Sequence, residues 1–305
     1  MSSRDTRFQP LHEDPALFNE ALNFTSATTG FSMRLAEKDY FCSVALSYLA
    51  HETHDLVFKG GTCLAKVHAE FYRLSEDLDF LIPIPCDASR SVRSLRARVL
   101  APLLDGLVRV FPVFSIERPF TGHNNSSEYT ATVEYVSCIS GHPESIRLEV
   151  ALREPLLTPA GALPAHTLLL DPVSGSPFVE PVEIPCLSLT ESFAEKYRAA
   201  LSRREPAIRD FFDIDFAALN LHVSPATPGL PDLVRQKMVV PGNGPIDVSS
   251  ARFAALKFQM ETRLKPVLRG KDFAAFDLDR VFGLVTGMAE RLQRGSPSAD
   301  AEGEP

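Results

Sequence analysis

Three short runs of residues carry most of the chemistry that this sequence offers. Gly60-Gly61-Thr62 stands between a short apolar step and a helical pattern, and such a glycine pair lets backbone N–H groups approach a phosphate at the positive end of a helix. Asp77 and Asp79 open the alternating stretch 77–84 and project from the same face of a predicted strand. A phosphate cradle beside paired carboxylates predicts a site for a nucleotide with Mg²⁺, which prefers oxygen ligands.

A third carboxylate is expected from a neighbouring strand. In the stretch 146–152 the apolar side chains alternate with polar ones, and Glu149 lies on the polar face of that strand. We therefore take Glu149 as the candidate that completes the acidic site.

The elements that must position these residues can be read from hydrophobic periodicity. The glycine turn follows a helix at 34–50 and a strand at 57–58, and precedes a helix from residue 64. An arginine-rich helix at 89–108 and a strand at 110–116 come next, and Ser140-Gly141-His142-Pro143 joins two longer strands, 129–139 and 146–152. This order predicts an α/β (α+β) fold in which helices flank a mixed β-sheet.

The second half of the chain indicates a helical domain. Seven prolines between residues 154 and 187 predict an extended connection. Ser188-Leu189-Thr190-Glu191 has the form of a capping box, and it opens a helix to about residue 204. Further helices are predicted at 207–221, 248–268 and 277–294. The expected domains are an N-terminal arm (1–30), a core domain (31–187), a helical C-terminal domain (188–294) and a disordered tail (295–305).

Composition limits the class of protein. The 305 residues carry 31 Lys and Arg against 39 Asp and Glu, a net charge of −8 that argues against a generally basic nucleic-acid coat. We find no apolar run long enough for a membrane helix and no signal peptide, and we expect a cytoplasmic monomer. The five cysteines form no CxxC pair, so we interpret them as buried hydrophobic residues rather than a zinc or disulfide framework.

Several blocks of this sequence resemble the polymerase-β-like nucleotidyltransferases, and within them the AbiEii/AbiGii toxin group with its MenT-type relatives. The resemblance covers roughly residues 35 to 220, and its motifs occur in the family's order. It rests on Glu37-Lys38-Asp39-Tyr40, Phe58-Lys59-Gly60-Gly61-Thr62, Arg73-Leu74-Ser75-Glu76-Asp77-Leu78-Asp79-Phe80, Ile146-Arg147-Leu148-Glu149-Val150, Glu195-Lys196-Tyr197-Arg198-Ala199 and Arg209-Asp210-Phe211-Phe212-Asp213-Ile214. The last third of the chain shows no diagnostic motif, and Glu149 stands where many such enzymes have Asp.

The resemblance implies transfer of a nucleotidyl group from an NTP to an acceptor hydroxyl by two-metal catalysis, with Mg²⁺ or alternatively Mn²⁺. Asp77, Asp79 and Glu149 would be the metal ligands, with Glu149 as ligand or general base. A cognate antitoxin is the expected protein partner. The residues implied to bind the nucleotide or its phosphates are Gly60, Gly61, Thr62, Lys66, Ser75, Lys196, Asp210 and Asp213.

Two details of this site stay open in the sequence. Asp210 or Asp213 would orient Lys196 or the nucleotide, and Arg209 with Asp213 could equally form an ordinary intrahelical ion pair. Negative charge added to Ser75 by phosphorylation or nucleotidylation would repel the carboxylates and switch the enzyme off.

The acceptor follows less directly from the residues. Two arginine and lysine clusters could bind RNA phosphates, and family members reported to modify tRNA favour tRNA as the acceptor. The alternatives are a small-molecule acceptor such as an aminoglycoside, a protein hydroxyl, or a non-catalytic nucleotide-binding protein. The clusters are Arg90, Arg93, Arg96 and Arg98, and Arg263, Lys265, Arg269 and Lys271.

Overall fold

The computed structural model of the chain describes residues 10–294 and divides them into two compact units. Unit 1 comprises the chain up to Leu189 together with Val267–Arg269, and unit 2 comprises Thr190–Pro266 and the helices that follow Arg269. The expected tail, 295–305, lies outside the described residues. No helix in the described part is both long and apolar enough to cross a bilayer.

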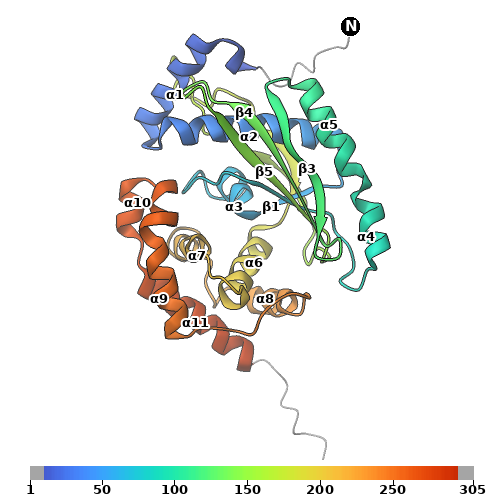
Figure 1. Cartoon of the computed structure of the whole chain (residues 1–305). Coiled ribbons are helices and arrows are strands. Elements are labelled where there is room, and N and C mark those ends of the chain that lie inside the picture. The colour runs from blue at the N-terminus through green and yellow to red at the C-terminus, as the bar shows by residue number, and fades with distance from the viewer. Residues whose placement is uncertain (1–9, 295–305) are drawn as a thin grey trace, which may run out of the picture. The chain divides into compact units, whose positions relative to one another are not determined.

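Unit 1 is built on one seven-stranded mixed sheet (Figure 1), which confirms the predicted fold class. The strand order is β3-β4-β5-β2-β1-β7-β6. The pairs β2·β5 and β1·β7 are parallel, and the other neighbouring strands are antiparallel. The strands are β1 (Val57–Lys59), β2 (Leu78–Leu81), β3 (Phe114–His123), β4 (Glu128–Val136), β5 (Pro143–Ala151), β6 (Gly161–Ala165) and β7 (Val182–Cys186).

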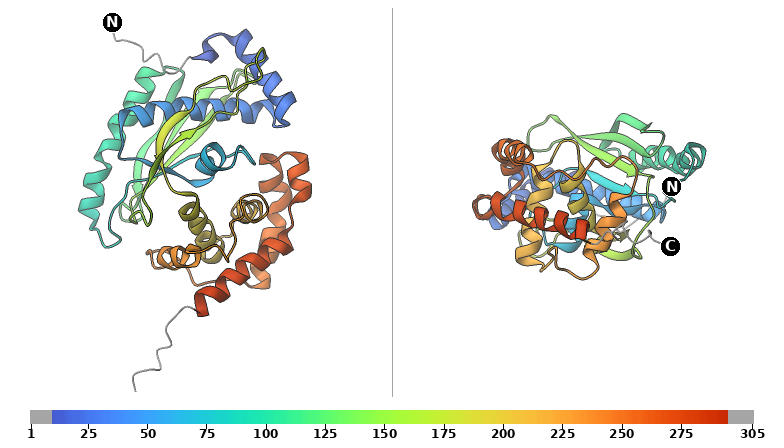
Figure 2. Two further views of the ribbon diagram at one scale, coloured as in Figure 1. Left: turned by 180° about the vertical axis from the view of Figure 1, so that it is seen from behind. Right: turned by 90° about the horizontal axis from the view of Figure 1, so that it is seen from below.

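The helix α2 (Met33–Glu52) forms the centre of the core of unit 1 and lies along one face of the sheet (Figures 1 and 2). The Ser32 hydroxyl caps it by accepting from the Leu35 N–H. Nearly all its residues from Leu35 to Ala50 are buried, so it packs on several sides rather than along one stripe. Two further helices, α4 (Arg90–Arg96) and α5 (Leu100–Val110), replace the single predicted helix at 89–108.

The N-terminal segment differs from the predicted arm. Residues Pro15–Thr29 form helix α1, which Asp14 caps by accepting from the N–H groups of Ala16 and Leu17. Phe18 of α1 is fully buried and packs against the rings of Tyr40 and Phe41 of α2. This part of the chain therefore belongs to the core of unit 1, because its aromatic side chain fills space that α2 leaves open.

The proline-rich segment also differs from its prediction as a plain extended connection. It contains β6 and β7, which form an antiparallel hairpin at the edge of the sheet. Pro164 lies in the edge strand β6, where a missing N–H donor is tolerated. The strand β7 pairs on its other side with β1, a long-range contact that the local sequence does not reveal.

The predicted helix after the glycine turn is much shorter than expected. Helix α3 covers only Gly60–Cys63, and a π-helical turn, Leu64–His68, follows it directly. Glu70 and Phe71 then adopt positive φ angles of 45° and 57°, which reverse the chain before Asp77. Such π-helical turns are frequent at functional sites.

Unit 2 is helical, as predicted. Helices α7 and α11 pack together through the stacked rings of Phe211 and Phe282, 6.2 Å apart, and through a bidentate ion pair in which Arg280 donates to Asp215 at 2.7 Å. Helix α8 (Leu230–Met238) lies within the stretch 222–244, for which no helix was predicted. The helices are α6 (Leu189–Ser202), α7 (Ile208–Asn220), α8 (Leu230–Met238), α9 (Ser250–Gln259), α10 (Gly270–Ala275) and α11 (Leu278–Arg294).

Candidate active site

The turn from β1 into α3 brings the first glycine of the motif against Asp79. Gly60 has φ = +77°, and a Cβ atom placed on it would lie 2.1 Å from the Asp79 carboxylate oxygen. A side chain at this position would therefore clash and also strain the backbone. The glycine is required because the backbone of the turn and the Asp79 carboxylate occupy adjoining space.

The absence of a side chain at Gly61 leaves room for the buried guanidinium of Arg73. A Cβ atom on Gly61 would lie 2.5 Å from the Arg73 Nη2 atom and 3.1 Å from the Ser75 hydroxyl oxygen. Arg73 is 2% exposed and donates to the Leu74 carbonyl at 3.2 Å. The glycine pair, Arg73 and Ser75 thus form one compact group of backbone N–H, guanidinium and hydroxyl, which are the donors that an anion requires.

The strand register places Glu149 beside Asp79. In the sheet, Asp79 of β2 is paired with Lys59 of β1 on one side and with Glu149 of β5 on the other. Directly paired residues project from the same face, so these three side chains lie in a row across three strands. Asp77 immediately precedes β2 and has the same parity as Asp79. The two aspartates and Glu149 are all partly exposed.

This donor set suits a hard divalent cation. Three carboxylates that are neither fully buried nor fully solvated offer oxygen ligands of the type that Mg²⁺ and Mn²⁺ prefer. Arg147 lies 2.9 Å from the Glu149 carboxylate, and its own side chain is half exposed. The ion pair involves one oxygen of the Glu149 carboxylate.

Thr62 links the glycine turn to the start of the acidic strand. Its hydroxyl donates to the backbone carbonyl oxygen of Asp77, and the residue is 1% exposed. In the structure this hydroxyl therefore holds the chain at Asp77 in place. Any contact of Thr62 with a triphosphate would have to come from its backbone N–H.

Lys66 is buried and paired with residues of α2, whereas the sequence predicted a phosphate contact. It is 2% exposed, and its ammonium group is 2.6 Å from the Asp39 carboxylate and donates to the Ser43 hydroxyl oxygen at 2.8 Å. Both partners belong to α2. We accordingly leave Lys66 out of the proposed nucleotide site, because a buried ammonium with these partners ties the π-helical turn to α2.

The loop before Asp77 is anchored by a charge cluster. Arg34 and Lys38 of α2 lie within 4.0 Å of both Glu76 and Glu144. The hydrogen bond from Arg34 is the main cause that lowers the pKa of Glu144. Glu76 is the residue next to Asp77, so this cluster fixes the backbone from which the Asp77 carboxylate projects.

A second charge cluster lies within unit 2. The Lys196 ammonium of α6 is 2.8 Å from Asp210 and 2.9 Å from Asp213, and Asp210 also lies 3.2 Å from Arg203. Both aspartates of α7 therefore orient Lys196, where the sequence left the choice between them open. Arg209, the other expected partner of Asp213, donates to the backbone carbonyl of Arg263.

Two basic residues near the site received no role from the sequence. Arg73 and Lys59 stand in the motifs that carry the family resemblance, yet a charged residue in such a motif looks no different from a solvated one. Arg73 is 2% exposed and lies beside Gly61, and Lys59 is 8% exposed and is paired with Asp79. The folded structure, and not the sequence, therefore indicates that these two residues belong to the site.

Comparison with known proteins gives a family that agrees with these residues. A family model described as nucleotidyl transferase AbiEii toxin, type IV toxin–antitoxin system, matches residues 45–286. The match includes the glycine turn, the three carboxylates and the Lys196 cluster. No curated protein sequence matches the chain.

Solved structures share the fold at low sequence identity. The crystal structure of JHP933 from Helicobacter pylori is 16% identical, with a TM-score of 0.51, and the alignment covers 87% of this chain and 94% of that one. A second structure from H. pylori, described as a proposed nucleotidyltransferase, is 15% identical, also with a TM-score of 0.51, and the alignment covers 87% and 96% of the two chains. These similarities extend over both units.

Proposed function

Because the chain belongs to the AbiEii nucleotidyl transferase toxin family of type IV toxin–antitoxin systems, and is therefore a nucleotidyltransferase, we propose that it transfers a nucleotidyl group from an NTP to a hydroxyl of tRNA. We propose further that Asp77, Asp79 and Glu149 carry the reaction with divalent metal ions. The transfer forms a phosphodiester at the acceptor oxygen and releases pyrophosphate.

The observation that carries this proposal is the row of side chains across β1, β2 and β5. Asp79 is paired in register with Lys59 and Glu149, and its carboxylate adjoins the Gly60 backbone. A site that brings carboxylates next to a phosphate-binding turn matches a metal-bound triphosphate. The same row would be hard to explain as a solvated sheet face, since Lys59 is buried.

The chain's own residues divide the work in this proposal. Asp77 and Asp79 hold the cations, and backbone N–H groups of the glycine turn bind the phosphate oxygens. Arg73, buried against Gly61, lends positive charge to the bound triphosphate without a direct contact being required. When bound, divalent cations would polarise the acceptor oxygen and neutralise charge on the departing pyrophosphate.

Glu149 keeps two possible roles. It either binds a cation or accepts the proton of the attacking hydroxyl, and Arg147 lies 2.9 Å from its carboxylate. Ser75 lies beside Gly61, so negative charge on its hydroxyl is expected to oppose triphosphate binding directly.

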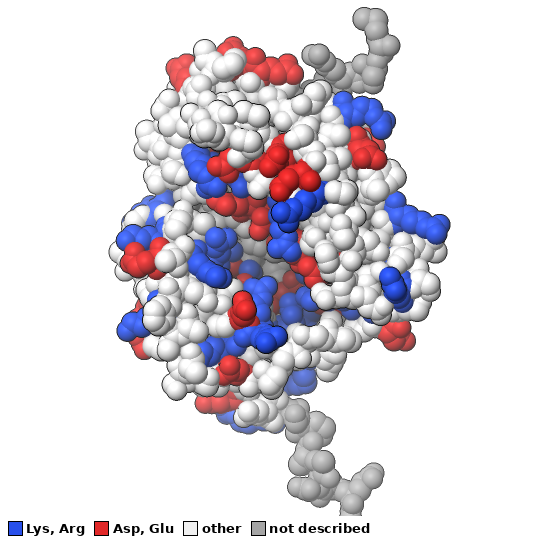
Figure 3. Space-filling model, in the orientation of Figure 1, with Lys and Arg blue, Asp and Glu red and all other residues white. Residues whose placement is uncertain are grey.

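An RNA acceptor is supported by α4. This helix has no buried residue, and it exposes Arg90 and Arg96 to solvent. On the face drawn in Figure 3, Lys and Arg are interspersed with Asp and Glu rather than gathered in one large patch. Local arginine contacts to phosphates therefore suit this chain better than binding through its overall charge of −8.

The test is a labelling reaction with purified protein, Mg²⁺, each α-³²P-labelled NTP in turn and total cellular RNA, compared with Asp79→Asn. We expect one NTP to label small RNA of tRNA size with the wild type alone. Label on protein instead would replace RNA with a protein hydroxyl as acceptor. An absence of label from a folded protein that binds NTP would point to a small-molecule acceptor or to binding without catalysis.

The toxin assignment has its own test. Induced expression of the wild-type chain should arrest growth, and the Asp79→Asn variant should not. Growth should be restored by co-expression of the cognate antitoxin, which is expected to be encoded beside the toxin. Equal growth arrest by the wild type and by Asp79→Asn would mean that toxicity does not depend on nucleotidyl transfer.

A further inference from the structure

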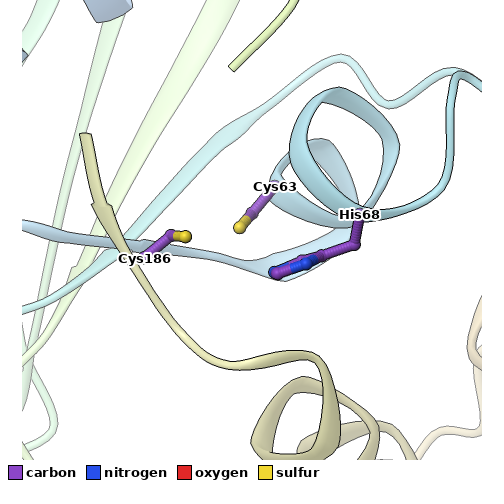
Figure 4. Close-up of side chains that lie close together, drawn as sticks. All are labelled: Cys63, His68 and Cys186. Carbon is purple, nitrogen blue, oxygen red and sulfur yellow. The ribbon is translucent and has the colours of Figure 1, made fainter. Parts of the chain in front are cut away.

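Two side chains that follow the glycine turn meet a third that is far away in the sequence. Cys63 ends α3, His68 ends the π-helical turn and Cys186 ends β7 (Figure 4). The figure shows the two thiols and the imidazole pointing toward one another. One donor atom from each residue lies within 4.8 Å of the other two. Within residues 10–294, this is the group of His, Cys, Asp or Glu side chains that meets this criterion.

We propose that Cys63, His68 and Cys186 bind a Zn²⁺ ion. Two cysteines and one histidine form a common ligand set for zinc, with a fourth position left to water or another ligand. In a tetrahedral site with Zn–S bonds of about 2.3 Å, neighbouring donor atoms are separated by ~3.6 to 3.8 Å. The observed group needs to contract by only about 1 Å to reach that geometry.

A hydrogen bond to the backbone fixes the tautomer of His68 in the form that can bind a cation. Its Nε2 atom lies 2.9 Å from the carbonyl oxygen of Leu187, the residue that follows Cys186. A carbonyl oxygen only accepts hydrogen bonds, so Nε2 carries the proton and Nδ1 keeps its lone pair. Metal-binding histidines commonly have such a backbone partner for the second nitrogen, which fixes the tautomer and the ring orientation.

Burial also favours a bound ion over chance proximity. Both cysteines are 0% exposed, and the histidine is partly exposed. The soft thiolate donors suit zinc, whereas the oxygen ligands at Asp77 and Asp79 suit magnesium.

The site would join three elements that shape the glycine turn. Cys63 directly follows Thr62, and β7 pairs with β1, the strand that leads into Gly60. A zinc ion would therefore clamp α3 and the π-helical turn to β7 and reduce movement of the phosphate-binding backbone. The inference uses none of the proposed catalytic residues, so it stands or falls separately from the proposed function.

The experiment titrates metal-free, reduced full-length protein with Co²⁺ while excess Mg²⁺ occupies oxygen sites. Cobalt bound to cysteines in a tetrahedral site gives thiolate charge-transfer absorption, which carboxylates do not give. We expect one equivalent to bind and Zn²⁺ to displace it. Zn²⁺ should also raise the Tm of the wild type by about 5 °C at saturating concentration.

Variants identify the ligands. Cys186→Ser, Cys63→Ser and His68→Gln should each weaken binding at least about tenfold and remove much of the Tm increase. Cys42→Ser is the buried control, and Cys138→Ser is the exposed one; both should bind as the wild type does. The proposal is overturned if the folded wild type shows no thiolate absorption, if the ligand variants bind normally, or if oxidation pairs Cys63 with Cys186 while no metal binds under reducing conditions.

Discussion

At the scale of single residues, Asp79 is the most constrained position of the candidate active site. It adjoins Gly60 and is paired in register with both Lys59 and Glu149. A change here removes a proposed cation ligand without removing a core side chain, because Asp79 is partly exposed.

We predict that Asp79→Asn lowers kcat for nucleotidyl transfer by at least about 10²-fold, since the loss of one charge weakens stabilisation of the transition state. The Tm should change little, as the amide preserves the volume of the side chain. Asp87→Asn, an exposed aspartate of the same unit, is the control and should retain full activity. Wild-type kcat in Asp79→Asn would exclude this residue from catalysis.

The Gly60 position separates backbone strain from steric contact. Gly60→Ala should cost about 1–2 kcal/mol for its positive φ and should also displace the Asp79 carboxylate, so that transfer falls at least about tenfold. Gly141 has a similar φ of +69°, but a Cβ atom placed on it would meet no atom within 4 Å, so Gly141→Ala should lose stability alone. Urea unfolding and transfer rates of the two variants check this, and equal activity would contradict the close approach of Asp79.

At the scale of elements, the position of the π-helical turn depends on a buried ion pair. Lys66 and Asp39 are 0% and 3% exposed in their side chains, and Asp39 also accepts from the Leu168 N–H at 2.8 Å. The Lys66 ammonium thus ties the π-helical turn to helix α2. The Asp39 carboxylate ties the segment before β7 to the same helix.

We predict that Lys66→Met destabilises the protein by about 3–5 kcal/mol, because the Asp39 carboxylate would remain buried without its cation. The double variant Lys66→Met, Asp39→Asn should recover part of this loss, since Asn can still accept from Leu168. Urea unfolding of the two variants provides the measurement. A loss below about 1 kcal/mol in the single variant would mean that the pair is not buried in solution.

Helix α4 is the element expected to touch RNA. The double variant Arg90→Ala, Arg96→Ala should raise the KM for RNA and flatten the slope of log KM against log salt by about 1.4–1.8, as two phosphate contacts are lost. The KM for NTP should stay unchanged. Arg118→Ala removes a 77% exposed arginine of β3 and is the matched control. An unchanged salt slope in the α4 variant would move the RNA contact elsewhere.

At the scale of the whole molecule, the two units carry different parts of the family's motifs. The glycine turn and the carboxylates belong to unit 1, and Lys196 with its two aspartates belongs to unit 2. Removing the charge of Lys196 tests whether the helical unit takes part in nucleotidyl transfer.

We predict that Lys196→Gln raises the KM for NTP and lowers kcat, together by about 10²-fold in kcat/KM, because the family resemblance implies that this side chain binds a phosphate. Lys237→Gln is matched, since Lys237 is another lysine of unit 2 with two carboxylate partners, Glu191 at 2.8 Å and Glu195 at 3.4 Å. It should lose stability but keep its KM for NTP. Parallel effects of both variants on kcat/KM would reduce the role of Lys196 to a structural one.

Local pattern in the sequence predicted much of this molecule. The alternation after Asp77, the glycine pair and the helical periodicity of 34–50 depend on near neighbours, so the α/β class, most helices and the family could be identified from them. The spacing of Gly60 and Asp79 also indicated that a turn and a strand lie together. Their metal and nucleotide roles remain predictions.

Only the tertiary structure decided which distant segments meet. Register across β1, β2 and β5 places Lys59 and Glu149 beside Asp79, and burial makes Lys66 a partner of Asp39 instead of a phosphate contact. Cys138 proved exposed, contrary to the interpretation of all cysteines as buried. Cys63 and Cys186 converge because β7 pairs with β1, and strand pairing of this kind depends on long-range contacts that the residues around each cysteine do not encode.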